Sequence, residues 1–411
     1  MATIIINIGK LLGLHANQPL KIPAVNDVAY IDNAWLLITD GKIKQWGSGT
    51  TWQAAAIAAS QIIDAEGGWI MPAFCDSHTH IVFDAWREKE FEDRINGLTY
   101  QEIFARGGGI LNSVERLRKA DEVKLYDDAY QRLYSMMLQG TGAIEIKSGY
   151  GLSLESELKM LRVIRKLKNQ TPVIIKSTFL GAHAVPVEFK NDMAGYIKHI
   201  IDDMLPAIAD EGLADFCDVF CEQDYFTADD TKLILETAAK YGMKPKVHAE
   251  QLSHSNGIST GINCNAISVD HLEFCNEADI DALSAGNTIA TILPGAQFFL
   301  SLQKPPARQL INAGAIVALA TDYNPGSSPM GNMALMMSMA CIMYKFTPQQ
   351  SFNAATINGA FAMDVGASTG SIVEGKCANL ILTKPLPSLA FIPYAVGHTF
   401  IESVFINGIK Q

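Results

Sequence analysis

The chain has 411 residues, of which 48% are hydrophobic and 18% charged, and its formal net charge at pH 7 is −11. This length and apolar content supply a large buried core. The acidic balance argues against a nucleic acid or a membrane as partner, because both require a basic face. Seven cysteines without a CxxC pair, no apolar run that could cross a bilayer and no signal-peptide pattern predict a cytoplasmic protein.

The two ends of the chain have the pattern of short strands joined by tight turns. Residues 34–38 and 42–46 flank Asp40-Gly41, which is typical of a hairpin with a type I′ turn. Near the other end, residues 378–382 and 402–406 are strand-like, and Asn407-Gly408 is a turn signal. We therefore expect residues 1–70 and 371–411 to form one small β-sandwich domain.

The middle of the chain, residues 71–370, alternates between short apolar runs and helix-like segments such as 154–168 and 229–241. Runs rich in Val, Ile, Phe and Ala are typical of strands buried on both faces. Eight such runs occur, at 69–75, 142–146, 173–179, 216–221, 244–247, 266–269, 288–293 and 316–320. The fold predicted is α/β, a (β/α)₈ TIM-type barrel carrying the small terminal domain.

Polar clusters follow nearly all of these runs. Seven of the nine histidines lie between residues 75 and 271, and five of them stand at predicted strand ends: His78, His80, His183, His248 and His271. Active sites of (β/α)₈ barrels are built at the carboxyl ends of the strands. We therefore expect these histidines to meet at one mouth of the barrel.

His78 and His80 are two residues apart, so on an extended strand both side chains point to the same side. An HxH pair by itself is more often a pair of surface or core histidines than a metal site. His248 and Asp322, each at the end of another buried strand, complete a set of three imidazoles and one carboxylate. That set suits one zinc or iron ion better than calcium or magnesium.

Such a centre can hydrolyse an amide, because a bound metal ion yields hydroxide at neutral pH and polarises a carbonyl. A carboxylate beside the water can accept its proton and pass it to the departing nitrogen, and Asp322 is the candidate for both roles. His271 is expected to hydrogen-bond the attacked carbonyl or to orient the nucleophile.

The segments PAFCDSHTH, EIKSGYGL, FLGAHAVP, VHAEQLS, SVDHLE, LPGAQFFL and ATDYNPGSSP occur in this order. In this respect the chain resembles the imidazolonepropionase family of the amidohydrolase superfamily, over roughly residues 71–370. The resemblance implies hydrolysis of 4-imidazolone-5-propanoate, a small anion, to N-formimino-L-glutamate, and it implies a homodimer. It assigns the metal ligands to His78, His80, His248 and Asp322, and substrate contacts to Arg87, Tyr150, His183, Gln251, Asn324, Gly326 and Ser327. A guanidinium such as Arg87 is what a propionate tail in an acidic protein requires.

Two other functions remain open at this stage. A deaminase on the same barrel would resemble this chain in its metal ligands but would carry a glutamate where Gln251 stands, and glutamine cannot shuttle a proton. A barrel that had lost catalysis would normally lack ligands, and all four are present. Lys147, at the end of the second predicted strand, either anchors a carboxylate or the neighbouring loop or, as in some amidohydrolases, bridges two metals in carboxylated form.

Overall fold

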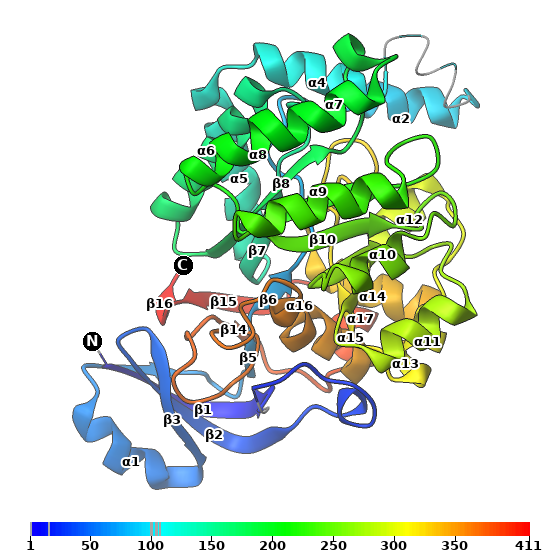
Figure 1. Cartoon of the computed structure of the whole chain (residues 1–411). Helices are drawn as coiled ribbons and strands as arrows, with labels where there is room; N and C mark the ends of the chain where they lie inside the picture. The colour runs from blue at the N-terminus through cyan, green and yellow to red at the C-terminus, as the bar shows by residue number, and fades with distance from the viewer. Residues whose placement is uncertain (1, 15–16, 99–101, 103–105, 107) are drawn as a thin grey trace.

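The computed structural model describes residues 2–14, 17–98, 102, 106 and 108–411, which form two eight-stranded sheets (Figure 1). The strands of the first sheet are parallel and neighbour one another in chain order. They are β6 (Phe74–Asp76), β7 (Thr141–Lys147), β8 (Ile174–Ala182), β9 (Phe216–Cys221), β10 (Lys244–Ala249), β11 (Ser268–His271), β12 (Ile289–Ile292) and β13 (Val317–Leu319). The predicted (β/α)₈ barrel is confirmed.

Helices separate the barrel strands and cover the outside of the sheet (Figure 1). The longer ones are α2 (Glu88–Ile95), α4 (Ile110–Lys119), α5 (Glu122–Leu138), α6 (Leu154–Gln170), α9 (Ala228–Lys240), α11 (Glu277–Ala285), α14 (Met333–Tyr344) and α15 (Pro348–Ala355). The shorter ones are α7 (Met193–His199), α8 (Leu205–Asp210), α10 (Gly257–Asn263), α12 (Pro294–Leu300), α13 (Ala307–Ala313) and α16 (Ile357–Ala362). Two further short helices, α1 (Trp52–Ala55) and α17 (Phe391–Tyr394), lie in the chain between strands of the second sheet. The predicted helices 154–168 and 229–241 correspond to α6 and α9.

The barrel closes between the segments that follow β6 and β13. The Asp322 N–H donates to the His78 carbonyl over 2.9 Å, and the His80 N–H donates to the Tyr323 carbonyl over 2.9 Å. Thr79 and Tyr323 form a parallel bridge. Three of the four predicted metal ligands therefore lie on the two segments whose backbones complete the barrel.

The second sheet contains strands from both ends of the chain. In spatial order it comprises β16 (Ile409–Lys410), β15 (Ile401–Ile406), β14 (Leu380–Thr383), β5 (Ile70–Pro72), β1 (Ala2–Leu12), β2 (Tyr30–Thr39) and β3 (Lys42–Ser48), with β4 (Gln61–Asp64) paired to β1. The strands expected in a small sandwich are thus hydrogen-bonded into one mixed sheet, because β5 pairs with both β1 and β14. Both chain ends lie on this side of the molecule (Figure 1).

Turn chemistry explains how these terminal strands are joined. Asp40 and Gly41 have φ of 50° and 76°, and Asn407 and Gly408 have φ of 49° and 74°. Positive φ at both central residues is the type I′ geometry that suits twisted antiparallel strands. The two predicted hairpin turns are confirmed.

The first predicted strand, 69–75, is divided in the structure. Its first half is β5 of the terminal sheet and its second half is β6 of the barrel, with Ala73 between them. The Ala73 N–H donates to the Asn379 carbonyl, whereas the Phe74 N–H donates to the Gly140 carbonyl. An apolar run does not reveal such a change of sheet, because both halves are buried.

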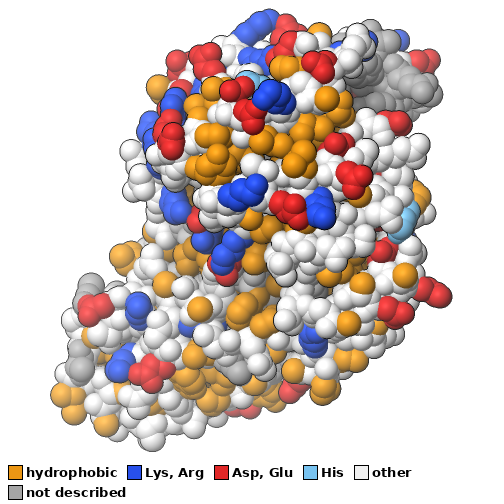
Figure 2. Space-filling model, viewed as in Figure 1, with side chains coloured by type: hydrophobic (Ala, Val, Ile, Leu, Met, Phe, Trp, Pro, Cys, Tyr) orange, Lys and Arg blue, Asp and Glu red, His pale blue; other side chains and the backbone are white. Residues whose placement is uncertain are grey.

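Charge is mixed on one face of the molecule. On the face shown in Figure 2, Lys and Arg side chains are interspersed with Asp and Glu side chains. Among the described residues, no helix is both long and apolar enough to span a membrane.

Candidate active site

A cavity of about 510 Å³ opens at the end of the barrel where the strands terminate. Eleven of the twelve predicted site residues line it: His80, Arg87, Tyr150, His183, His248, Gln251, His271, Asp322, Asn324, Gly326 and Ser327. The twelfth, His78, is fully buried and contacts His80. Apolar side chains, among them Phe220 and Leu300, complete the wall. Residues far apart in the chain therefore share one site.

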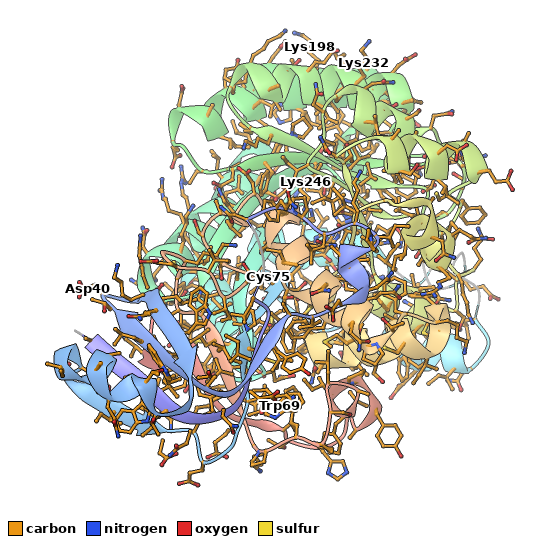
Figure 3. All side chains as sticks on the ribbon, turned by 90° about the horizontal axis from the view of Figure 1, so that it is seen from below. Asp40, Trp69, Cys75, Lys198, Lys232 and Lys246 are labelled. Carbon is orange, nitrogen blue, oxygen red and sulfur yellow. The ribbon has the colours of Figure 1, made fainter. Side chains whose placement is uncertain are left out.

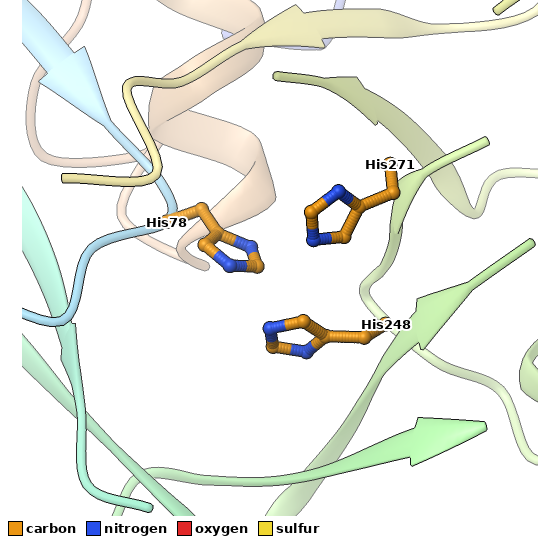
Figure 4. A group of neighbouring side chains, drawn as sticks. All are labelled: His78, His248 and His271. Atoms are coloured by element: carbon orange, nitrogen blue, oxygen red, sulfur yellow. The ribbon is translucent and has the colours of Figure 1, made fainter. Parts of the chain in front are cut away.

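Two overlapping groups of potential metal ligands lie at the base of this cavity. His78, His80 and Asp322 form one group, and His78, His248 and His271 form the other, with the ligand atoms of each group within 4.8 Å of one another. The second group is drawn in Figure 4, where the three rings converge from the segment after β6, from β10 and from β11. His78 belongs to both groups, so the site is centred on this residue.

The spacing of these atoms fits a tetrahedral metal ion. Nε2 of His78 lies 3.2 Å from Nε2 of His80, and both lie 3.5 Å from Oδ1 of Asp322. Ligand atoms roughly 2.0–2.1 Å from a tetrahedral ion are about 3.3 Å apart. A mixed imidazole and carboxylate set with this spacing suits a transition metal such as zinc or iron.

The protonation of the imidazoles also suits metal binding. Burial, reinforced by nearby positive charges, lowers the pKa of His78 and of His80 well below its ordinary value. His78 Nδ1 donates to Asp270 Oδ2 over 2.7 Å, which leaves the lone pair on Nε2. Neutral imidazoles with a carboxylate on the opposite nitrogen are the usual form of metal-ligating histidines.

His271 has a different electrostatic environment. Burial alone would lower its pKa, but the negative charges of Glu273, Asp322 and Asp270 outweigh it and raise the pKa above the ordinary value. Nδ1 of His271 lies 3.9 Å from Oε2 of Glu273. The backbone of His271 has φ of 87°, which side chains other than glycine rarely adopt. His271 is therefore suited to hold a proton facing the cavity.

Arg87 precedes helix α2 and is held by a buried carboxylate. Its Nε and Nη2 donate to the two oxygens of Glu90 over 2.9 and 2.5 Å. Its Nη1 lies against Gly326, where a Cβ would come within 2.2 Å of that nitrogen. The guanidinium is thus fixed in the cavity wall, and glycine at 326 leaves the space for it.

Tyr150 and His183 form the aromatic side of the cavity. The His183 ring is stacked on His80 at 5.4 Å between centroids, and Tyr150 lies 5.7 Å from His183. Because the Gly149 carbonyl can only accept, His183 Nδ1 donates to it over 3.0 Å. Burial lowers the pKa of His183 to about 3, so its Nε2 is an acceptor, whereas burial raises the pKa of Tyr150 and keeps its hydroxyl protonated.

The site has the features of a metal-dependent hydrolase, and comparison with known proteins decides the family. Residues 69–409 match the model of the amidohydrolase family. The chain is 49% identical to an imidazolonepropionase of Christiangramia forsetii and 50% identical to one of Flavobacterium johnsoniae, over 99% of both chains in each pair. The chain belongs to the imidazolonepropionase family of amidohydrolases.

Solved structures of two deaminases share the fold of this imidazolonepropionase family member. An Escherichia coli guanine deaminase superposes with a TM-score of 0.75 at 12% identity, covering 100% of this chain and 99% of its own. A zinc-bound adenosine deaminase of Xanthomonas campestris gives a TM-score of 0.72 at 15% identity, covering 100% and 92%. At such identities the likeness extends to the fold alone.

Several residues of this family member's site were not predicted from the sequence. Glu90, Asp218, Asp270 and Glu273 are buried and face Arg87 or a site histidine. Asp270 and Glu273 lie within two residues of His271 in the chain. This closeness to a predicted site residue was the sequence signal that could have identified them as part of the site. Lys147 Nζ lies 2.6 Å from Glu145 and 2.7 Å from Asp218, which are the contacts expected of a lysine that anchors carboxylates.

Proposed function

We propose that this protein hydrolyses the ring amide of 4-imidazolone-5-propanoate to N-formimino-L-glutamate in histidine degradation. The observation that carries the proposal is the convergence of His78, His80 and Asp322 in the cavity that also contains a fixed guanidinium, Arg87. The three metal-ligating side chains support attack on an amide, and the guanidinium of Arg87 supports recognition of a carboxylate. The relatives at 49–50% identity bear the name of this activity.

We assign His78, His80, His248 and Asp322 as ligands of one zinc or iron ion. When bound there, such an ion would lower the pKa of a water molecule and would offer positive charge to the substrate carbonyl. We include His248 in this set because one of its ring nitrogens lies within 4.8 Å of a ring nitrogen of His78, and because its Nδ1 lies 2.9 Å from Asp218 Oδ2.

Proton transfer is assigned to Asp322 and His271. The Asp322 carboxyl group is buried, and its Oδ1 lies 3.5 Å from Nε2 of His78 and of His80, so it stands beside the position of the ion and its water, where a carboxylate can accept a proton and release it again. Asp322 takes the proton of the attacking water and passes it to the departing ring nitrogen. His271, whose pKa is raised, donates a hydrogen bond to the carbonyl oxygen as negative charge develops there.

The substrate is oriented by the walls of the cavity. Arg87 holds the propionate, since Glu90 occupies Nε and Nη2 and leaves Nη1 towards the cavity loop. The Nε2 atom of His183 accepts from a ring N–H, and the Tyr150 hydroxyl donates. Gln251, which also lines the cavity, offers an amide to the imidazolone ring.

The loop after Asp322 contributes through its backbone and through Ser327. The Asn324 side chain uses its oxygen for the N–H groups of Gly326 and Ser327, and its amide for the Asp322 carbonyl and the Ser327 hydroxyl. These bonds use the full capacity of an asparagine side chain. Asn324 therefore shapes the substrate loop, and Gly326 and Ser327 present it to the ligand.

The purified protein offered imidazolonepropanoate should remove the ring absorbance and produce N-formimino-L-glutamate, with one zinc or iron per chain by elemental analysis. Asp322→Asn should abolish turnover, and retained turnover would exclude the proton relay. Ammonia release from guanine, adenine or cytosine, with no turnover of imidazolonepropanoate, would instead assign the protein to the deaminases. We further propose that the enzyme acts in the cytoplasm and that it forms a homodimer. Sedimentation analysis of the purified protein tests the dimer.

A further inference from the structure

Beneath the proposed metal ligands lies a group of five fully buried charged side chains, which we call the basal cluster. Its members come from strands β7, β9, β10 and β11 and are Glu145, Lys147, Asp218, Lys246 and Asp270. Lys246, which is labelled in Figure 3, is 0% exposed. Burying so many charges is unfavourable unless each is paired, so the contacts within the cluster indicate what it does.

Each lysine lies among carboxylates. Lys147 Nζ lies 2.6 Å from Glu145, 2.7 Å from Asp218 and 3.8 Å from Asp270. Lys246 Nζ pairs with the other oxygen of Glu145, lies 3.8 Å from Asp270 and donates to the Ser77 carbonyl over 2.9 Å. Asp218 and Asp270 thus have a cation on one side.

On their other side, the same two aspartates face proposed metal ligands. Oδ2 of Asp270 accepts from Nδ1 of His78 over 2.7 Å. Oδ2 of Asp218 lies 2.9 Å from Nδ1 of His248, and its Oδ1 accepts the His248 backbone N–H over 3.1 Å. A carboxylate on Nδ1 fixes the rotation of the ring and leaves Nε2 as the ligand atom.

We propose that Lys147 and Lys246 are positioning residues for the metal ion, acting through Asp218 and Asp270. The lysines hold the two aspartates in place, and the aspartates hold His78 and His248 with Nε2 towards the ion. This inference rests on the proposed metal site and deepens it. Metal affinity then depends on the histidine ligands, on the aspartates that contact these histidines and on the lysines that contact the aspartates. Lys147 Nζ lies 2.7 Å from Asp218 and 3.8 Å from Asp270, so we expect Lys147 to contribute more to metal affinity than Lys246.

The chain provides a matched control in another buried lysine. Lys376 is 2% exposed, and its Nζ donates to the carbonyls of Gly366 and Thr369 and to the hydroxyl of Ser371. These partners belong to the segment that leads into the terminal sheet. Lys376→Met therefore reports what the loss of any buried lysine does to the fold.

The test compares the full-length wild type, Lys147→Met and Lys376→Met by Zn²⁺ competition with a chromogenic chelator and by thermal unfolding. Lys147→Met should bind Zn²⁺ about 10- to 100-fold more weakly than wild type, the range typical for residues that orient metal ligands. Lys376→Met should bind within about twofold of wild type even if it melts earlier. The visible spectrum of bound Co²⁺ should change in Lys147→Met alone.

A second variant separates positioning from simple charge balance. Lys147→Met with Glu145→Gln removes one charge of each sign, so the net charge of the cluster is kept. The double variant should still lose Zn²⁺ affinity, because Asp218 has lost its cation. Wild-type affinity and Co²⁺ spectrum in either variant overturn the inference. A wild-type protein that binds no metal refutes the proposed function itself, so the two failures are distinguishable.

Discussion

At the scale of single residues, the site depends on backbone conformations and close approaches that few residue types allow. His271 and Asp322 have φ of 87° and 52°. Positive φ at such residues costs of order 1–3 kcal/mol and persists only where the surroundings require it. Gly326 provides the space in which the Arg87 guanidinium lies. Substitution of His271 should therefore mainly lower kcat, whereas substitution of Gly326 should mainly raise KM.

His271→Asn should lower kcat about 100-fold or more while leaving the metal content unchanged. Asparagine tolerates positive φ, so the backbone is kept and only the imidazole is lost. Steady-state kinetics with elemental analysis of the same sample measures both quantities. Turnover close to that of wild type would remove His271 from the mechanism.

Gly326→Ala should raise KM at least about tenfold with little change in kcat, because the new methyl group displaces Nη1 of Arg87 by occupying its place. Arg87→Ala should have the same signature, since it removes the partner of the propionate. Gly397→Ala is the control, as nothing lies within 4 Å of the Cβ it would add. An unchanged KM in both site variants would contradict the assignment of Arg87 to the carboxylate.

At the scale of elements, buried carboxylates hold the loops that follow the strands. Glu157 of α6 accepts the N–H groups of Gly149, Gly151 and Leu152, which surround Tyr150. Glu222, after β9, accepts the N–H groups of Gln251 and Leu252. Glu250 is fully buried and accepts two N–H groups at the start of α10, so it serves that helix and does not face solvent.

Glu157→Ala should lower the free energy of unfolding by about 3 kcal/mol, because three backbone N–H groups lose a buried partner. It should also raise KM, since the loop that presents Tyr150 is no longer held. Glu155→Ala on the same helix is exposed and should leave both quantities nearly unchanged. Urea unfolding and kinetics on the two variants make the comparison, and equal effects would exclude a specific role for Glu157.

At the scale of the whole molecule, single polar side chains join segments from opposite ends of the chain. Asn358 is fully buried and accepts the Leu20 N–H over 2.7 Å, while its amide donates to the carbonyls of Leu20 and Val317 over 3.0 and 2.9 Å. It thereby ties the amino-terminal segment to barrel strand β13. The barrel and the terminal residues are stabilised together.

Asn358→Ala should lower the free energy of unfolding by about 3 kcal/mol, because it leaves both backbone polar groups of Leu20 without their partner in the interior. Asn191, which is exposed, should tolerate alanine with a change of no more than about 0.5 kcal/mol. Thermal unfolding followed by circular dichroism measures the difference. Identical transitions would show that Asn358 does not couple the two segments.

The features that the sequence determined by itself are those with a local physical cause. The spacing of two residues directs His78 and His80 to the same side of an extended segment. Asp-Gly and Asn-Gly pairs, which tolerate positive φ, mark the two hairpin turns. Apolar runs mark the eight barrel strands. These signals act over a few residues, so they can be recognised without the fold. The ligand set followed from the spacing of His78 and His80 and from the strand ends that carry His248 and Asp322, whereas the substrate contacts were assigned by family resemblance. The structure brings all of those residues to one cavity or its base.

Only the tertiary structure decided which distant charges meet. The join of residues 78–80 to 322–323 depends on closing the barrel at one register. The pairing of Lys147 and Lys246 with Asp218 and Asp270 depends on the same closure, because strand order and stagger determine which inward side chains share a layer. An isolated lysine or aspartate in an apolar strand carries no local mark of its partner. The ligands could therefore be predicted, whereas the charges that hold them could not.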